Sequence, residues 1–313
     1  MTADPKAKNR MSNVAPLATR GGVGPSRTVL PVGSWKTIFD CLVEVFPNVA
    51  ASVWKRRMSL GEVIDERGVA VTEHRIHEAN LGIFYYRSIE IEDRIPFEEQ
   101  VLFQDDYLVV ADKPHFLPVI PSGRFVQETL LVRLKNRLAI DSLVPIHRID
   151  SGTAGIVVFC IQDSQRDAYQ ALFRQREVEK CYEAIGLANA SLKLPMTYES
   201  QMVQDEHFMR MREETDRGAP NSLTHIDLIE ARGEHALYRL RPVTGRKHQL
   251  RVHCAALGIP ILNDPMYPVM QPKPAEDAPR DYSKPLQLLA RIVEFRDPIT
   301  GAARKFVSKR HLS

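Results

Sequence analysis

Apolar residues between positions 35 and 46 recur every three to four residues, the spacing of one face of a helix. They are Trp35, Ile38, Phe39, Leu42, Val43 and Phe46. The Pro47-Asn48 pair ends this predicted helix, and a second helix follows with Val53 and Trp54. A β-like stretch continues to residue 91. The pattern therefore predicts two short helices followed by a hairpin.

Two stretches without periodicity flank this segment. Residues 1–34 mix Pro, Gly, Ser, Thr and basic residues, which is typical of a disordered, cationic tail. Residues 91–99 are polar and contain Pro96, which indicates a linker. We therefore expect a tail at 1–34, a small domain at 35–95 and a large domain at 96–313.

The large domain opens with two short apolar runs, at 101–103 and 107–110, around Gln104, Asp105 and Asp106. This pattern predicts a strand, a turn and a strand. A buried strand is expected at 156–160, and another strand at 235–240 leads through a turn into a helix. Strands and helices alternate irregularly, so we expect an α+β fold with a mixed, largely antiparallel sheet.

Composition adds little to this picture. With 44% hydrophobic residues among 313, the chain can bury a substantial core. Its 42 Lys and Arg against 39 Asp and Glu give a net charge of +3. A nucleic-acid-binding protein with so small an excess has to concentrate its cations on one face.

The cysteines and the N-terminus bear on location. Cys41, Cys160, Cys181 and Cys254 form no CxxC pair, which favours buried thiols in a reducing cytosol. No apolar run is long enough to span a membrane, and the N-terminus lacks the apolar core of a signal peptide. We expect a cytoplasmic protein without a membrane segment.

One candidate site is the loop HRIDSGTAG at 147–155, directly before the predicted buried strand. Asp150 lies there between cations and a Gly/Ser/Thr turn, and polar loops on a rigid sheet often hold catalytic groups. Taken alone, the loop is better explained as a surface Asp in a turn.

Two further segments are candidates. In PVTGRKHQLRVH, at 242–253, Arg246 and Lys247 are expected in the first turn of a helix, where they oppose its dipole. That placement favours binding of phosphate or a carboxylate, and a solvated basic turn is the alternative. In KCYEA, at 180–184, Tyr182 either packs in a half-buried strand or offers its ring to a base.

Together the three segments resemble the RluA branch of the RNA pseudouridine synthases. That branch carries an HRLDxxTSG loop, a KxYxA strand and a PxTGRxHQLRxH segment in the same order. Two further stretches, FQDDYLVVADKP and LGIPILNDPMY, match it more loosely. The resemblance runs from residue 101 to the C-terminus. Ile149, Ala154, Asn263, Pro265 and the pair Leu289-Ala290 depart from the family pattern without touching its chemistry.

The resemblance implies a function and a site. The chain would convert uridine in RNA to pseudouridine, with Asp150 as the catalytic carboxylate, Tyr182 stacked on the base, and Arg251 paired with Asp150 in a bidentate manner. Arg148 would help to displace the base. The isomerisation needs no oxidation or energy input, so no cofactor is expected, and the histidines lack the partners of a metal site.

The small domain loosely resembles the S4 RNA-binding module, although Glu66-Arg67-Gly68 replaces the usual turn. An S4-like module favours ribosomal RNA over transfer RNA as the substrate. We expect a monomer with no obligate protein partner. The residues expected to contact RNA are His147, Arg148, Arg246, Lys247, Arg56 and Arg57.

Two other functions are weighed against this one. An N-glycosidase normally uses two carboxylates, and a nuclease a cluster of acids around metal, neither of which the loop offers. A non-catalytic RNA-binding protein that retained the fold is the remaining alternative. Product analysis separates these functions, because isomerisation leaves the mass of the RNA unchanged.

Overall fold

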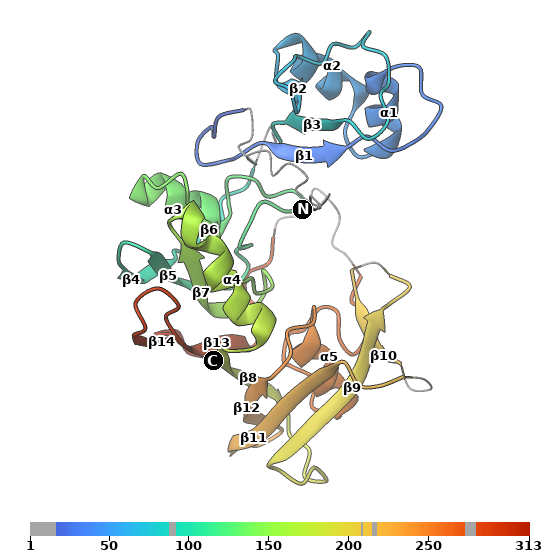
Figure 1. Cartoon of the computed structure of the whole chain (residues 1–313). Helices are drawn as coiled ribbons and strands as arrows, with labels where there is room; N and C mark the ends of the chain where they lie inside the picture. Colours follow the sequence, from blue (N-terminus) through green and yellow to red (C-terminus); the bar gives the residue numbers. More distant parts are fainter. Residues whose placement is uncertain (1–16, 88–91, 208, 215–217, 273–279) are drawn as a thin grey trace, which may run out of the picture. The chain divides into compact units, whose positions relative to one another are not determined.

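The computed structural model describes residues 17–87, 92–207, 209–214, 218–272 and 280–313. The chain divides into two compact units, residues 1–92 and 93–313 (Figure 1). Each unit buries hydrophobic cores of its own.

The first unit is a three-stranded antiparallel sheet with two helices. Its elements are β1 (Ser26–Val29), α1 (Ile38–Val45), α2 (Ala51–Ser59), β2 (Val63–Asp65) and β3 (Gly82–Tyr85). Strand β3 lies between β1 and β2. Helix α1 begins at Ile38 because the Thr37 hydroxyl accepts the Asp40 N–H at 3.1 Å, and the Asp40 carboxylate accepts the Thr37 N–H at 3.0 Å.

Strand β1 lies inside the segment predicted to be a disordered tail, and this part of the prediction is wrong. Its residues alternate between half-buried and exposed, and the following Leu30 is 1% exposed in the core of the unit. Such a short strand carries no clear local signal, because pairing with the distant β3 determines it. The first sixteen residues of the predicted tail lie outside the described residues.

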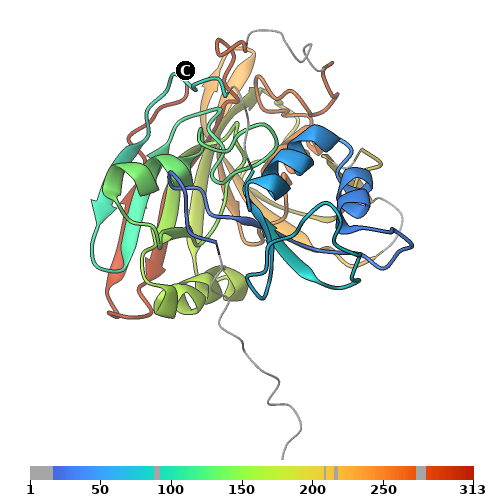
Figure 2. The same cartoon turned by 90° about the horizontal axis from the view of Figure 1, so that it is seen from above.

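The second unit contains one large sheet, seen from a second direction in Figure 2. Its strands are β4 (Gln100–Gln104), β5 (Leu108–Lys113), β6 (Val144–Pro145), β7 (Ala154–Cys160), β8 (Glu179–Leu187), β9 (Met196–Gln204), β10 (Met211–Glu214), β11 (Ser222–Arg232), β12 (His235–Pro242), β13 (Leu288–Arg296) and β14 (Ala303–Val307). Its helices are α3 (Leu130–Leu138), the 3₁₀ helix η1 (Asp163–Gln165), α4 (Arg166–Gln175) and α5 (Gln249–Ala256).

The sheet is largely antiparallel, as predicted. Its strand order is β10-β9-β11-β12-β8-β13-β7-β5-β4, with β14 beside β13 and β6 beside β7. Among the described residues, β13 and β7 form the single parallel pair. The predicted strand–turn–strand is β4–β5, and the predicted strands at 156–160 and 235–240 lie within β7 and β12. The α+β fold class is confirmed.

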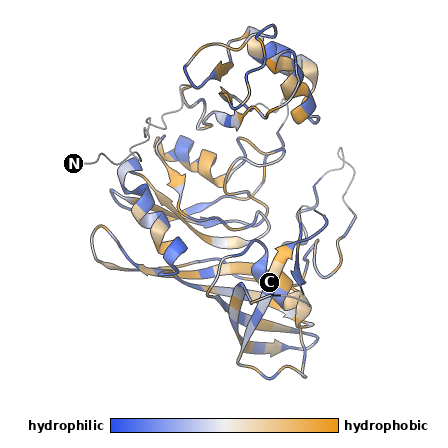
Figure 3. Ribbon diagram, turned by 45° about the vertical axis from the view of Figure 1, so that its right-hand side comes forward, coloured by the Kyte–Doolittle hydropathy of each residue, from blue (hydrophilic) through white to orange (hydrophobic). Residues whose placement is uncertain are grey.

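Strands β5 and β7 are buried on both faces, because a helix covers each side. Val110 and Val158 pack with α4 in one core cluster, whereas Val109 and Val157 pack with α3 in another. Neighbouring residues belong to different clusters because successive side chains of a strand point to opposite faces of the sheet. Helices that cover a sheet in this way are amphipathic, and Figure 3 shows hydrophilic and hydrophobic residues within single helices.

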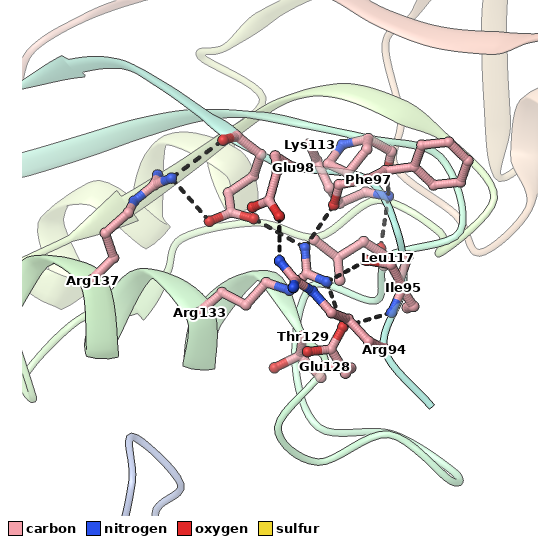
Figure 4. Close-up of polar contacts among 12 residues, drawn as sticks. Arg94, Ile95, Phe97, Glu98, Lys113, Leu117, Glu128, Thr129, Arg133 and Arg137 are labelled. Carbon is pink, nitrogen blue, oxygen red and sulfur yellow. Dashed lines mark hydrogen bonds and ion pairs between the residues drawn. The ribbon is translucent and has the colours of Figure 1, made fainter. Parts of the chain in front are cut away.

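The segment predicted to be a linker is fixed to the second unit. Ile95 is fully buried, and its N–H donates to the Glu128 carboxylate at 2.7 Å. Arg133 of α3 donates to the carbonyls of Ile95 and Phe97 at 2.7 and 2.6 Å, and it also pairs with Glu128 and Glu99 (Figure 4). From Ile95 onward the linker prediction is therefore wrong.

Candidate active site

The loop between β6 and β7 carries Asp150, and two side chains hold its backbone. Lys113, at the end of β5, is fully buried and donates to the carbonyls of Ser151, Leu117 and Pro114 at 3.0, 2.8 and 2.9 Å. His115 Nδ1 donates to the Gly152 carbonyl at 2.7 Å. Burial lowers the pKa of Lys113 well below its usual value, although the Asp150 charge opposes this. The loop is therefore a rigid support for the carboxylate.

Arg251 of α5 contacts two carboxylates rather than one. Its Nη1 donates to Asp150 Oδ2 at 3.1 Å, whereas its Nε and Nη2 donate to the two oxygens of Asp264 at 2.8 and 2.7 Å. The predicted Asp150–Arg251 pair is present, but the bidentate geometry belongs to Asp264. Burial lowers the pKa of Arg251, and the hydrogen bonds and charges of Asp264 and then Asp150 outweigh burial and raise it. Arg251 is thus a fixed cation.

Asp264 is a site residue that the sequence did not reveal as one. Its side chain is 0% exposed, and its Oδ1 also accepts the N–H groups of Met266 and Tyr267 at 2.8 and 3.2 Å. It therefore fixes the guanidinium in one orientation, and Asp150 receives an N–H of Nη1. Its position within LGIPILNDPMY was the only available signal.

Tyr182 lies on β8 and lines the same cavity as Asp150. Burial, and then the negative charge of Asp150, raise the pKa of its phenol. The hydroxyl is therefore neutral at physiological pH and can donate as well as accept a proton.

Two cavities, of about 1000 and 940 Å³, are both lined by Asp150, His248 and Arg251. The larger also contains Tyr182 and a set of cations: Arg148, Arg174, Arg176, Lys180, Arg246 and Lys247. The lining surface of the smaller is mainly apolar, with Leu286, Met266 and Tyr267 among the residues that form it. The larger cavity has room for a nucleotide, and both a carboxylate and several cations line it. This combination suits chemistry on a polyanionic substrate.

Comparisons with known proteins identify the family of this chain. The model of the RNA pseudouridylate synthase family matches residues 107–256, which contain Asp150, Tyr182 and Arg251. The chain is 32% identical over 234 residues to the dual-specificity RNA pseudouridine synthase RluA of Haemophilus influenzae, covering 70% of this chain and 97% of that protein. The chain belongs to the RNA pseudouridylate synthase family.

Other members are similar over different lengths. An uncharacterized RNA pseudouridine synthase of Synechocystis is 29% identical, over 68% of this chain and 73% of that protein. The mitochondrial tRNA pseudouridine(32) synthase of Saccharomyces cerevisiae is 31% identical, over 74% of this chain but only 50% of its own length. The solved structure of human RNA pseudouridylate synthase domain containing 1 shares the fold, with a TM-score of 0.55 and 21% identity over 70% of this chain and 86% of that one.

The structure of this synthase corrects the predicted position of Arg246 and Lys247. Helix α5 begins at Gln249, so both cations precede it in an exposed turn at the larger cavity. The turn is held because Gln249 Oε1 accepts the Thr244 hydroxyl at 2.7 Å and the Arg246 N–H at 3.1 Å. The two cations therefore do not oppose a helix dipole from inside its first turn.

His147 and Arg57 lack the exposed positive charge that is expected of an RNA-binding side chain. His147 Nε2 accepts the Val158 N–H at 3.1 Å, and burial lowers the pKa of the ring to about 3, so it is neutral. Arg57 is 5% exposed and stacks on Trp54, with its guanidinium carbon 5.1 Å from the ring centroid. We therefore exclude Arg57 as a phosphate contact, whereas Arg56 is exposed on α2.

The described residues contain no group of three or more metal-ligating side chains. No helix within the described ranges is long and apolar enough to cross a membrane.

Proposed function

We propose that Asp150 is the carboxylate with which this synthase isomerises uridine in structured RNA. The position of that carboxylate carries the proposal. Arg251 and His248 approach its Oδ2 at 3.1 and 3.7 Å, while no hydrogen bond or ion pair within the described part of the chain engages Oδ1. Because Asp150 lines both cavities, Oδ1 is the oxygen available to a substrate.

The reaction breaks the bond between ribose C1′ and uracil N1 and forms a bond between C1′ and C5. N1 gains a proton and C5 loses one, so the composition of the RNA is unchanged. Asp150 acts either by adding to C1′ or by removing the C2′ proton to give a glycal. Both routes need an ionised carboxylate held in place, which the Arg251 contact favours.

The uridine has to leave its stack first, which costs a few kcal/mol. Arg148 is exposed beside the larger cavity, where it can occupy the vacated place, and Tyr182 offers its ring to the extruded base. A neutral Tyr182 hydroxyl takes the C5 proton only if it passes on its own proton. The Asp150 carboxylate, whose charge acts on the phenol, is the candidate acceptor.

The cations of the larger cavity are the proposed contacts for the RNA backbone. Three of them, Arg148, Arg246 and Lys247, were expected from the sequence. Three more line the same cavity: Arg174, Arg176 and Lys180. Arg174 and Arg176 lie at the end of α4, and Lys180 lies at the start of β8. Such contacts supply affinity without reading sequence.

The identity of the RNA is part of the proposal. The relatives named above include a transfer RNA enzyme and a dual-specificity RNA enzyme. Transfer RNA and ribosomal RNA are both candidate substrates of this chain. The preference for ribosomal RNA depends on the S4-like interpretation of the first unit and remains a prediction, as do the monomeric state and the cytoplasmic location.

Pseudouridine mapping of total RNA tests the proposal. RNA is compared from cells that lack the protein and from the same cells supplied with the wild type or with Asp150→Asn. We expect one or more uridines to be converted by the wild type only. Sites converted equally by Asp150→Asn would reject Asp150 as the catalytic group. No difference between wild-type and deficient cells would favour the non-catalytic alternative.

A further inference from the structure

His248 lies between the Asp150 carboxylate and the Tyr267 hydroxyl. Its Nε2 lies 3.7 Å from Asp150 Oδ2, and its Nδ1 lies 3.0 Å from the Tyr267 hydroxyl. That hydroxyl also accepts the N–H of Met211 at 2.8 Å. A chain of polar contacts therefore runs from the backbone of β10 through Tyr267 and His248 to Asp150.

The chain favours one tautomer of the ring. Among the described residues, the Tyr267 oxygen has two polar neighbours, the Met211 N–H, which it accepts, and His248 Nδ1, so we assign the hydroxyl proton to Nδ1. An Nδ1 that accepts this proton leaves the other proton on Nε2, facing Asp150. At 3.7 Å the contact is longer than a hydrogen bond, and such contacts often shorten when substrate binds.

We propose that His248 is a positioning residue for Asp150: its neutral imidazole, held by Tyr267, directs the Nε2–H at Oδ2 and leaves Oδ1 as the reacting oxygen. This inference rests on the proposed catalytic role of Asp150. Arg251 donates to the same Oδ2, so the two donors together fix the rotation of the carboxylate about its Cβ–Cγ bond.

The surroundings of His248 are consistent with a neutral donor. Burial is the main cause that lowers the pKa of the ring to about 4, and the positive charges of Arg251 and Lys247 lower it further. The negative charges of Asp150 and Asp264 act in the opposite direction. A neutral ring can donate to the carboxylate without adding a second positive charge beside that of Arg251. His248 also has a φ of 57°, a left-handed conformation that is uncommon for residues other than glycine, directly before α5. Backbones of this kind cluster at functional sites.

The test is a set of substitutions in the full-length protein. The probe is RNA labelled with [5-³H]uridine and isolated from cells that lack the protein, because loss of the C5 proton releases tritium. At saturating enzyme, His248→Phe, which has no donor, is expected to slow release about tenfold or more. His248→Gln, whose amide can donate from nearly the same position, is expected to remain within about threefold of the wild type. The enzyme concentration that gives half the maximal rate is expected to be unchanged in both.

Two further variants separate the possible outcomes. Tyr267→Phe removes only the hydroxyl that fixes the tautomer, and it is expected to slow release without changing half-saturation, which also tests the idea if His248→Phe does not fold. His225→Phe is the matched control, because His225 lies on β11 outside both cavities. Equal rates for His248→Phe, Tyr267→Phe and the wild type, with Asp150→Asn inactive, would overturn this inference alone. Equal slowing of the Gln and Phe variants would also overturn it. Tritium release by Asp150→Asn at the wild-type rate would instead reject the proposed function.

Discussion

At the scale of the residue, the site depends on how Arg251 is shared between two carboxylates. Asp264 takes two N–H groups and fixes the guanidinium plane, and Asp150 takes a third. A planar cation with a fixed fork can serve both partners, whereas a compact ammonium cannot. Asp150 is thus held by an arginine whose orientation a second, buried carboxylate fixes.

Arg251→Lys is therefore expected to be severely impaired although the charge is retained. We expect the rate of tritium release to fall by about a hundredfold, since one ammonium cannot hold Asp264 and orient Asp150 at once. Asp264→Asn should also be slow, because the guanidinium loses its charged, bidentate partner. Wild-type turnover by the Lys variant would show that this pairing is unimportant.

Tyr182→Phe separates the ring of Tyr182 from its hydroxyl. The ring can still stack on the base, so RNA binding should stay within a few-fold of the wild type. Loss of the C5 proton should become slow, and a rearranged base should accumulate with its C5 proton still attached. Rapid-quench analysis of the RNA detects this species. Normal multiple-turnover kinetics would leave Tyr182 with a packing role only.

A site residue could be predicted where a short sequence motif contains it, but not where tertiary contacts alone determine its role. Asp150, Tyr182 and Arg251 each lie in a motif that is readable along the chain. The role of Asp264 depends on which carboxylate meets the guanidinium fork, and tertiary contacts decide that. The burial of Arg57 likewise depends on Trp54 and Tyr85, which surround it only after folding.

At the scale of the element, the site depends on the close approach of β7 and β13. Gly155 has a φ of 109°, and a Cβ atom on it would lie 2.2 Å from the Ala290 carbonyl oxygen. The last glycine of the HRIDSGTAG loop therefore lets the parallel β13–β7 pair form at the end of the loop that carries Asp150. Elements with strong periodicity, such as α1 and the β4–β5 pair, were predictable. Strand β1 and the segment after Ile95 were not, because non-local contacts fix them.

Gly155→Ala is expected to lower the free energy of unfolding by about 3 kcal/mol or more, since backbone atoms would have to move. Gly301→Ala is the matched control. Gly301 also has a positive φ, of 72°, but no atom lies within 4 Å of the added Cβ. It should cost about 1 kcal/mol. Urea denaturation compares the two, and equal losses would show that the close approach does not matter.

At the scale of the whole molecule, the chain consists of two units, and the proposed catalytic residues all lie in the second. Arg56 is exposed on the first unit, which suits a role in RNA affinity rather than in chemistry. The two-unit organisation could be approximated from the polar stretch around Pro96. The exact division could not, because Ile95 is anchored by Glu128, which lies well beyond it in the sequence.

Removing residues 1–92 is expected to weaken RNA binding more than it slows the chemistry. Each lost phosphate contact should reduce the slope of log affinity against log salt by about 0.7 to 0.9. Saturating RNA should restore most of the rate, provided that circular dichroism shows the shortened chain to be folded. Arg56→Glu in the full-length protein should shift the salt slope in the same direction. An unchanged affinity and salt slope would rule out an RNA-binding role for the first unit.

Single-turnover tritium release by purified Asp150→Asn shows whether Asp150 performs the isomerisation. Asp141→Asn is the matched control, because Asp141 is an exposed carboxylate outside both cavities. We expect Asp150→Asn to bind the labelled RNA within a few-fold of the wild type but to release almost no tritium, while Asp141→Asn behaves as the wild type. If Asp150→Asn released tritium at a rate close to that of the wild type, another group would have to perform the reaction.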